Sequence, residues 1–164
     1  MDVERIFLQP SDWVPNNPRL PVLLYPAAID PTDDAGGFER LFEENGWEGI
    51  WRNGVFDYHH YHSTAHEVLG VASGEADLLI GGQSGFEVTV RSGDALALPA
   101  GTGHKRLSST SNFVMIGAYP PGQDADIQTS AASDVQLVQI AHVPLPENDP
   151  IMGRLGPMLA IWTE

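Results

Sequence analysis

The 164-residue sequence predicts an all-β sandwich or barrel with one or two short helices, on three observations. From Trp47 to Tyr119, short runs rich in valine, leucine, isoleucine and aromatic residues alternate with glycine-containing turns, a pattern typical of closely spaced short strands. The 17 glycines and 13 prolines favour many turns over long helices. The length fits one domain of roughly 100–200 residues, and composition does not change sharply along the chain, so we expect a single domain over residues 1–164.

Residues 1–46 are predicted to form an extension that packs on the barrel. Five prolines in the first thirty residues leave room only for short edge strands, because proline has no N–H for a sheet ladder. The expected strands are 5–9 and 22–25. Phe38, Leu41 and Phe42 then recur at helical spacing, with acidic residues before them and Gly46 after them. This predicts one short amphipathic helix lying on a sheet.

The strands expected in and around the core are 50–63, 67–72, 76–80, 86–91, 95–98, 104–107 and 113–119. Residues 123–133 are polar and small, and are expected to form a surface loop in which Asp124 and Asp126 cap turns instead of binding a second metal. The apolar segment 135–143 is expected to be a further strand, carrying His142 in a structural role.

Charge and composition exclude several classes of function. Eight basic residues against 22 acidic ones give a net charge of −14, which disfavours binding to nucleic acids or to anionic membranes. No cysteine is present, so disulfides, iron–sulfur clusters and thiolate zinc sites are ruled out. We see neither a secretory signal nor an apolar run of about 18 residues, and therefore expect a cytoplasmic protein without membrane spans.

Four of the six histidines lie within eight residues. Alternate side chains of an extended strand share a face, so His60 and His62 are expected to point to one side and His59 to the other. His59 is therefore interpreted as a residue that either supports the ligands from behind or lies at the surface. His66 directly precedes Glu67 and is expected to face away from it, in a packing or surface role.

Glu67 and His104 are candidates to join the His-x-His pair. Glu67 opens the next expected strand and faces the same interior if the chain turns at 63–65, while His104 follows a tight turn. Imidazole and carboxylate ligands of this kind suit iron(II), manganese, nickel, zinc or copper. The alternative is a set of partly exposed histidines that binds no metal.

The spacing of these residues resembles the two sequence motifs of the cupin superfamily. The first motif, Gly-x5-His-x-His-x3–4-Glu-x6-Gly, is matched at Gly54, His60, His62, Glu67 and Gly74, with four residues before the glutamate. The second, Gly-x5-Pro-x-Gly-x2-His-x3-Asn, is matched at Gly93, Pro99, Gly101 and His104, with Ser108 in place of the asparagine. The motifs span 54–108, and further stretches such as GAYPPGQD resemble the small single-domain bacterial cupins of the YjlB type.

This resemblance implies a jelly-roll β-barrel that encloses one divalent transition metal. The matching positions make His60, His62, Glu67 and His104 the four expected protein ligands. Iron and manganese are favoured, although nickel and zinc suit the same donors. A homodimer is expected by the same resemblance.

Interior residues near these ligands are candidates for binding a substrate. Strand alternation places Arg52 and Tyr58 on the face of His60, provided that no bulge intervenes, and Arg106 on the face of His104. An arginine could hold a substrate carboxylate through a bidentate pair; the alternatives are ion pairs at the barrel mouth for the arginines and a packing role for Tyr58. Glu67 is also a candidate general base.

The leading hypothesis is a metal-dependent enzyme, of dioxygenase, isomerase or lyase type, that acts on a small polar molecule. The first alternative is a non-catalytic cupin that binds a small molecule in the same pocket. The second is a storage-like or structural protein with an unused metal site.

Overall fold

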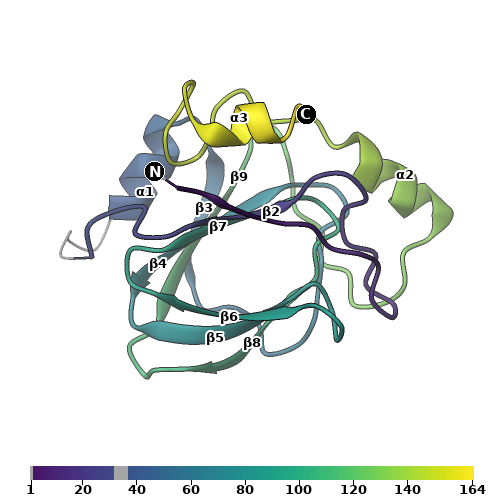
Figure 1. The fold of residues 1–164 in the computed structure, drawn as a ribbon, viewed down its shortest axis with the longest axis horizontal. Helices are drawn as coiled ribbons and strands as arrows, with labels where there is room; N and C mark the ends of the chain where they lie inside the picture. Colours follow the sequence, from purple (N-terminus) through teal and green to yellow (C-terminus); the bar gives the residue numbers. More distant parts are fainter. Residues whose placement is uncertain (1, 32–36) are drawn as a thin grey trace.

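The computed structural model describes residues 2–31 and 37–164, which form mainly antiparallel sheet (Figure 1). Its strands in chain order are β1 (Glu4–Ile6), β2 (Val22–Tyr25), β3 (Glu48–Asn53), β4 (Glu67–Ser73), β5 (Glu75–Ile80), β6 (Phe86–Arg91), β7 (Ala95–Leu98), β8 (His104–Ser109) and β9 (Val114–Tyr119). The helices are α1 (Gly37–Glu44), α2 (Asp134–His142) and α3 (Pro157–Ile161). None of these helices combines the length and apolar character needed to cross a membrane.

Two sheets face each other and enclose the inner core. One has six strands in the order β1-β2-β7-β4-β9-β3, and the other has three in the order β6-β5-β8. Leu69 and Val71 of β4, with Leu96 and Leu98 of β7, point into the space between the sheets and are buried there. The all-β jelly-roll fold predicted from the sequence is therefore confirmed, with α1, α2 and α3 instead of one or two helices.

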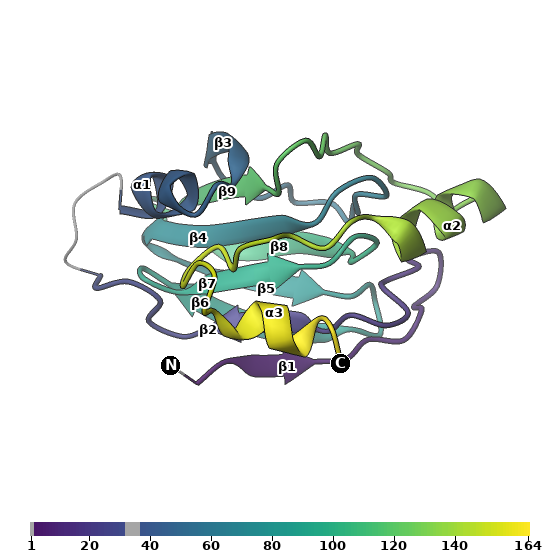
Figure 2. The ribbon, with the colours of Figure 1, turned by 90° about the horizontal axis from the view of Figure 1, so that it is seen from above.

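A second core covers the outer face of the six-stranded sheet, where α1 and α3 lie (Figures 1 and 2). Phe38 of α1 packs directly on Gly70 of β4, where an added Cβ would come within 2.5 Å of the ring. Both faces of β4 and β7 are thus buried, which explains why these strands read as continuous apolar runs. The predicted amphipathic helix is confirmed as α1; Asp33 and Asp34, expected to precede it, lie outside the described residues.

The segment that carries the His-x-His pair lies alongside β8 and is not a continuation of β3. Strand β3 ends at Asn53, and the chain returns to β8 through a hydrogen bond from Arg106 N to Phe56 O (2.9 Å). His60 and His104 then exchange two backbone hydrogen bonds, of 3.0 and 3.3 Å. The expected strand 50–63 is thus wrong as a single element, because residues 54–59 leave the sheet geometry after β3.

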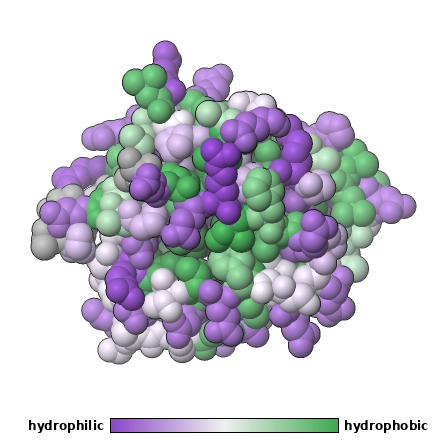
Figure 3. Space-filling model, viewed as in Figure 1, coloured by the Kyte–Doolittle hydropathy of each residue, from purple (hydrophilic) through white to green (hydrophobic). Residues whose placement is uncertain are grey.

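The expected strand 135–143 is wrong, because this segment forms helix α2. Ser133 caps it with a complete capping box: its side chain accepts from Gln136 N, and the Gln136 side chain accepts from Ser133 N. Only Ile140 is buried, while Val135 and Val138 remain exposed. Figure 3 shows apolar side chains at the surface on the side of the molecule where Figure 1 places α2. His142 therefore stands at the exposed end of a helix and not on a strand.

Candidate metal centre

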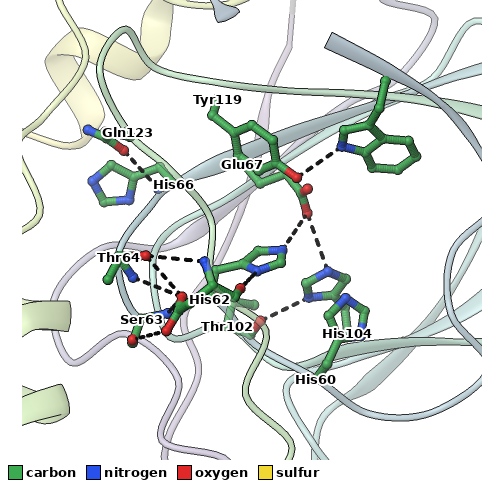
Figure 4. A network of polar contacts seen from close by, with 12 residues as sticks. His60, His62, Ser63, Thr64, His66, Glu67, Thr102, His104, Tyr119 and Gln123 are labelled. Carbon is green, nitrogen blue, oxygen red and sulfur yellow. Dashed lines mark hydrogen bonds and ion pairs between the residues drawn. The ribbon is translucent and has the colours of Figure 1, made fainter. Parts of the chain in front are cut away.

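Three imidazoles and one carboxylate from separate segments meet inside the barrel (Figure 4). One ligand atom from each of His60, His62 and His104 lies within 4.8 Å of the others, and all three residues are buried. Glu67 Oε1 lies 3.4 Å from His62 Nε2 and 3.3 Å from His104 Nε2. Glu67 is 2% exposed and belongs to β4, on the same inward face as Leu69. The structure thus brings all four sequence-predicted residues together, with Glu67 in contact with two of the three histidines.

The backbone fixes the orientation of each of the three imidazoles. The Nδ1 atoms of His60, His62 and His104 each face a main-chain carbonyl, belonging to Tyr58 (3.2 Å), Asp126 and Thr102 (3.0 Å) respectively. A neutral imidazole with Nδ1–H donating to a carbonyl keeps its lone pair on Nε2. Each ring therefore offers Nε2 as its ligand atom.

Buried polar atoms at the centre lack ordinary hydrogen-bond partners. His62 Nε2 and Glu67 Oε1 both fall in this class, since their mutual contact of 3.4 Å does not have hydrogen-bond geometry. Unsatisfied buried polar atoms are costly, and a cation is the partner that two such acceptors share. The donor set and its orphaned atoms therefore fit a divalent transition metal.

The charges of the centre are arranged around the carboxylate. Burial and the neighbouring His104 lower the pKa of His60 to about 3, so its ring is neutral and ready to act as a ligand. Burial opposes the charged form of His62, but Glu67 and the Asp126 carbonyl outweigh it and raise the pKa of His62. Burial likewise opposes ionisation of Glu67, yet His62 and His104 lower the pKa of its carboxyl. The carboxylate is thus held in its anionic form at the centre of the histidine cluster.

Asp126 supports the centre from the loop after β9. Its carboxylate accepts hydrogen bonds from Ser63 N (2.6 Å), the Ser63 hydroxyl, Thr64 N (3.2 Å) and Gln128 Nε2 (2.9 Å). Burial raises the pKa of Asp126, but these donors outweigh it and lower the pKa overall. Its carbonyl faces His62 at the same time. The turn-capping role expected for the Asp-x-Asp pair is thus confirmed at Asp126, which holds the turn after the His-x-His pair.

His66 and His59 both lie away from the centre. His66 is fully buried on the outer face of β4, where its Nδ1 accepts from Ala100 N at 2.9 Å and its ring packs 5.0 Å from that of Trp162. Burial lowers the pKa of His66 to about 4. His59 packs edge-on against Trp13, and burial lowers its pKa as well. The packing role expected for His66 is confirmed.

A cavity of about 270 Å³ opens onto the centre. Its wall is mostly apolar or aromatic, and includes Trp51, Val55, Phe56, Leu69, Tyr119, Ala125 and Ile127 beside the histidines. Arg52 also borders the cavity, but its guanidinium pairs with Glu39 at 2.7 Å. Strand alternation was expected to place Arg52 and Tyr58 on the face of His60 if the strand ran on without a bulge. Residues 54–59 do not continue β3, so this expectation does not apply.

Tyr58 and Arg106 lie outside the lining of this cavity. Tyr58 is exposed and stacks on Phe56, with ring centroids 4.8 Å apart. Arg106 lines a separate, more polar cavity of about 510 Å³, which shares residues 53–56 with the first. Its guanidinium donates to Val55 O at 3.2 Å and to Ser109 Oγ at 3.2 Å. Ser108, which replaces the motif asparagine, donates to Asp77 Oδ2 at 3.1 Å.

Sequence reasoning missed two residues beside Glu67, namely Trp51 and Tyr119. Trp51 Nε1 donates to the Tyr119 hydroxyl at 3.0 Å, and that hydroxyl lies against the Glu67 carboxylate. Burial, together with Glu67, raises the pKa of Tyr119. Trp51 lies in the mostly polar strand β3 and Tyr119 ends the apolar strand β9, and in neither strand does a local pattern separate the residue from core aromatics.

Comparison with known proteins agrees with the motifs. The cupin domain family matches residues 48–115. Uncharacterized protein YjlB of Bacillus subtilis (strain 168) is 39% identical over 99% of this chain and 98% of its own length. The chain is a cupin of the YjlB type. The resemblance noted from the two motifs is thereby confirmed.

Solved structures with some likeness to this cupin share little sequence with it. Acireductone dioxygenase from Bacillus anthracis, with a cadmium ion in its active centre, is 17% identical over 54% of this chain and 61% of that chain, with a TM-score of 0.39. Procruciferin, an 11S globulin from Brassica napus, is 18% identical over 84% of this chain and 39% of that chain, with a TM-score of 0.40. This cupin thus spans less than two thirds of either protein.

Proposed function

We propose that this cupin is a metal-dependent enzyme, of dioxygenase, isomerase or lyase type, acting on a small molecule. The observation that carries the proposal is the common orientation of His60, His62 and His104, whose Nδ1 atoms all face main-chain carbonyls. This leaves three Nε2 lone pairs beside the Glu67 carboxylate, at the end of a cavity large enough for a small ligand. Two of these atoms, His62 Nε2 and Glu67 Oε1, are buried next to each other without hydrogen-bond partners, which a shared cation would supply.

In this proposal the four residues hold one divalent transition metal. Three neutral nitrogen donors and one carboxylate suit iron and manganese, which we favour, and also nickel and zinc. Such a metal supplies Lewis-acid or redox chemistry when it is bound. The lowered pKa of Glu67 makes its carboxylate a ready ligand and a weak proton acceptor, so a role as general base is secondary here.

The cavity wall defines what the protein itself contributes to binding. Phe56, Leu69 and Ile127 present apolar surface, which displaces water and accommodates the body of a small substrate. Arg52 and Asn53 at the rim offer polar contacts, although Arg52 would first have to leave Glu39 to bind a substrate carboxylate. Arg106 and Tyr58 are weaker candidates for binding the substrate. Arg106 faces the neighbouring cavity, and Tyr58 is exposed at the surface.

The test of the enzymatic proposal is turnover by the metal-loaded protein. Iron- and manganese-loaded protein is offered a panel of diketones, keto acids and sugars, while oxygen uptake and product formation are followed. We expect turnover of at least one class, and loss of that turnover in His62→Ala. Tight binding of a panel member without any turnover would favour the non-catalytic binding cupin. Cytoplasmic location, homodimer formation and the absence of nucleic-acid and membrane partners stay predictions from the sequence.

A further inference from the structure

The indole of Trp51 lies directly over a glycine of the neighbouring strand. Trp51 of β3 is paired with Gly117 of β9, and a Cβ at position 117 would come within 2.0 Å of the indole Cε2. No side chain larger than hydrogen fits there while the indole keeps its place. This close approach sets the Nε1 atom of Trp51 at 3.0 Å from the hydroxyl of Tyr119, two residues further along β9.

In the hydrogen bond between Trp51 and Tyr119, the donor and the acceptor are fixed by chemistry. An indole N–H can only donate, so the Tyr119 oxygen is the acceptor and its own proton must be directed elsewhere. The Glu67 carboxylate is the hydrogen-bonding group on the other side of the hydroxyl. Figure 4 shows the Tyr119 oxygen beside the upper end of this carboxylate, while the lower oxygen faces His62 and His104.

We propose that Trp51 and Tyr119 are positioning residues for Glu67: the indole orients the phenol, and the phenol holds one carboxylate oxygen so that Oε1 stays directed at the histidines. The inference rests on the proposed metal centre, of which Glu67 is the carboxylate ligand. Groups that hydrogen-bond to metal ligands set the orientation and basicity of those ligands. The pair would therefore tune the metal affinity without touching the metal.

The surroundings of the pair support a role beyond packing. Both side chains border the cavity, and neither is fully buried, although Trp51 also packs against the inner core. On the histidine side, the Glu67 carboxylate faces His62 and His104 at 3.4 and 3.3 Å, but its Oε1 has no partner with hydrogen-bond geometry. Among the described residues, the Tyr119 hydroxyl is the donor placed to hold it.

The test measures metal affinity directly, by titrating metal-free protein with Mn²⁺ and Co²⁺. We expect Tyr119→Phe to weaken the affinity by about tenfold or more and to shift the visible absorption of the Co²⁺-loaded protein. The matched control is Tyr25→Phe, which removes a buried hydroxyl–carboxylate hydrogen bond to Asp149 (2.9 Å) outside the centre. That variant should lose stability but keep the wild-type affinity and spectrum.

Trp51→Phe is the second variant, and it carries the test if Tyr119→Phe does not fold. It removes the indole donor but leaves the phenol next to Glu67, so we expect an affinity between those of wild type and Tyr119→Phe, with a shifted Co²⁺ spectrum. The inference is overturned if the folded Tyr119 and Trp51 variants keep the wild-type affinity and spectrum, or if Tyr25→Phe changes both as much. Wild-type protein that binds neither metal would instead contradict the proposed function.

Discussion

The buried His66 ring is expected to make the free energy of unfolding decrease at acidic pH. The fully buried ring accepts a hydrogen bond from Ala100 N at Nδ1, so a second proton would have to enter at the atom that already faces an N–H. Burial is the main cause that lowers its pKa from 6.5 to about 4, while nearby Val143 and Pro144 carbonyls partly oppose the shift. In the unfolded chain the ring recovers its ordinary pKa near 6.5.

The sign and size of the effect follow from this difference. Below pH 6.5 the unfolded state binds a proton that the folded state does not, so the free energy of unfolding falls as the pH drops from 6.5 to 4. At about 1.4 kcal/mol for each pH unit, the loss attributable to His66 reaches about 3 kcal/mol at pH 4. Above pH 6.5 this contribution is fully present.

The assay is urea unfolding of metal-free protein between pH 4 and pH 8, for wild type and His66→Asn. Asparagine offers Oδ1 to the Ala100 N–H but does not titrate in this range. We expect the variant to be less stable at pH 8, because it leaves a gap beside Trp162, and to lose less stability on acidification. Parallel pH dependences for the two proteins would refute the reasoning, because every titratable group other than His66 is common to both.

Three further changes give separate expectations. Asp126→Ala removes the acceptor of Ser63 N and Thr64 N, and should lower the free energy of unfolding by about 2–4 kcal/mol and weaken Mn²⁺ binding; unchanged affinity in a titration would contradict the supporting role of the loop. Gly117→Ala forces the Trp51 ring to move, and should cost about 1–3 kcal/mol or more and shift the tryptophan emission; an unchanged emission spectrum would be inconsistent with the close contact. Ser133→Ala removes the α2 capping box, and should cost about 1 kcal/mol without altering metal affinity, as thermal unfolding and titration would show.

The strand pattern was sufficient to predict the all-β fold and most of its strands, and the motif spacing was sufficient to predict the clustering of the histidines. Alternation works for β4, where Glu67 and Leu69 face inward while Val68 faces outward, because the strand is regular and buried on both faces. It does not carry over from β3 to His60, because the chain leaves the sheet after Asn53 and bends before it returns. Parity arguments thus hold within one regular strand and not across an irregular connection.

The periodicity of apolar residues did not predict helix α2 or the position of Tyr119 beside Glu67. Helix α2 looks like a strand because Val135 and Leu137 alternate, yet the Ser133–Gln136 capping box was a readable sign of a helix start. Tyr119 carries no local signal: it ends an apolar strand, and its relation to Glu67 arises only from the pairing of β4 with β9. Long-range pairing is the information that a single sequence does not display.

The central claim is that His60, His62, Glu67 and His104 bind one metal ion together. The most direct measurement is metal analysis of protein purified without chelator, compared with Glu67→Ala and His104→Ala. His142→Ala is the matched control, because this histidine lies exposed at the end of α2. We expect about one transition-metal ion per chain in wild type and His142→Ala, and a clear loss in the other two variants. Metal content that stays the same in Glu67→Ala and His104→Ala would contradict the account.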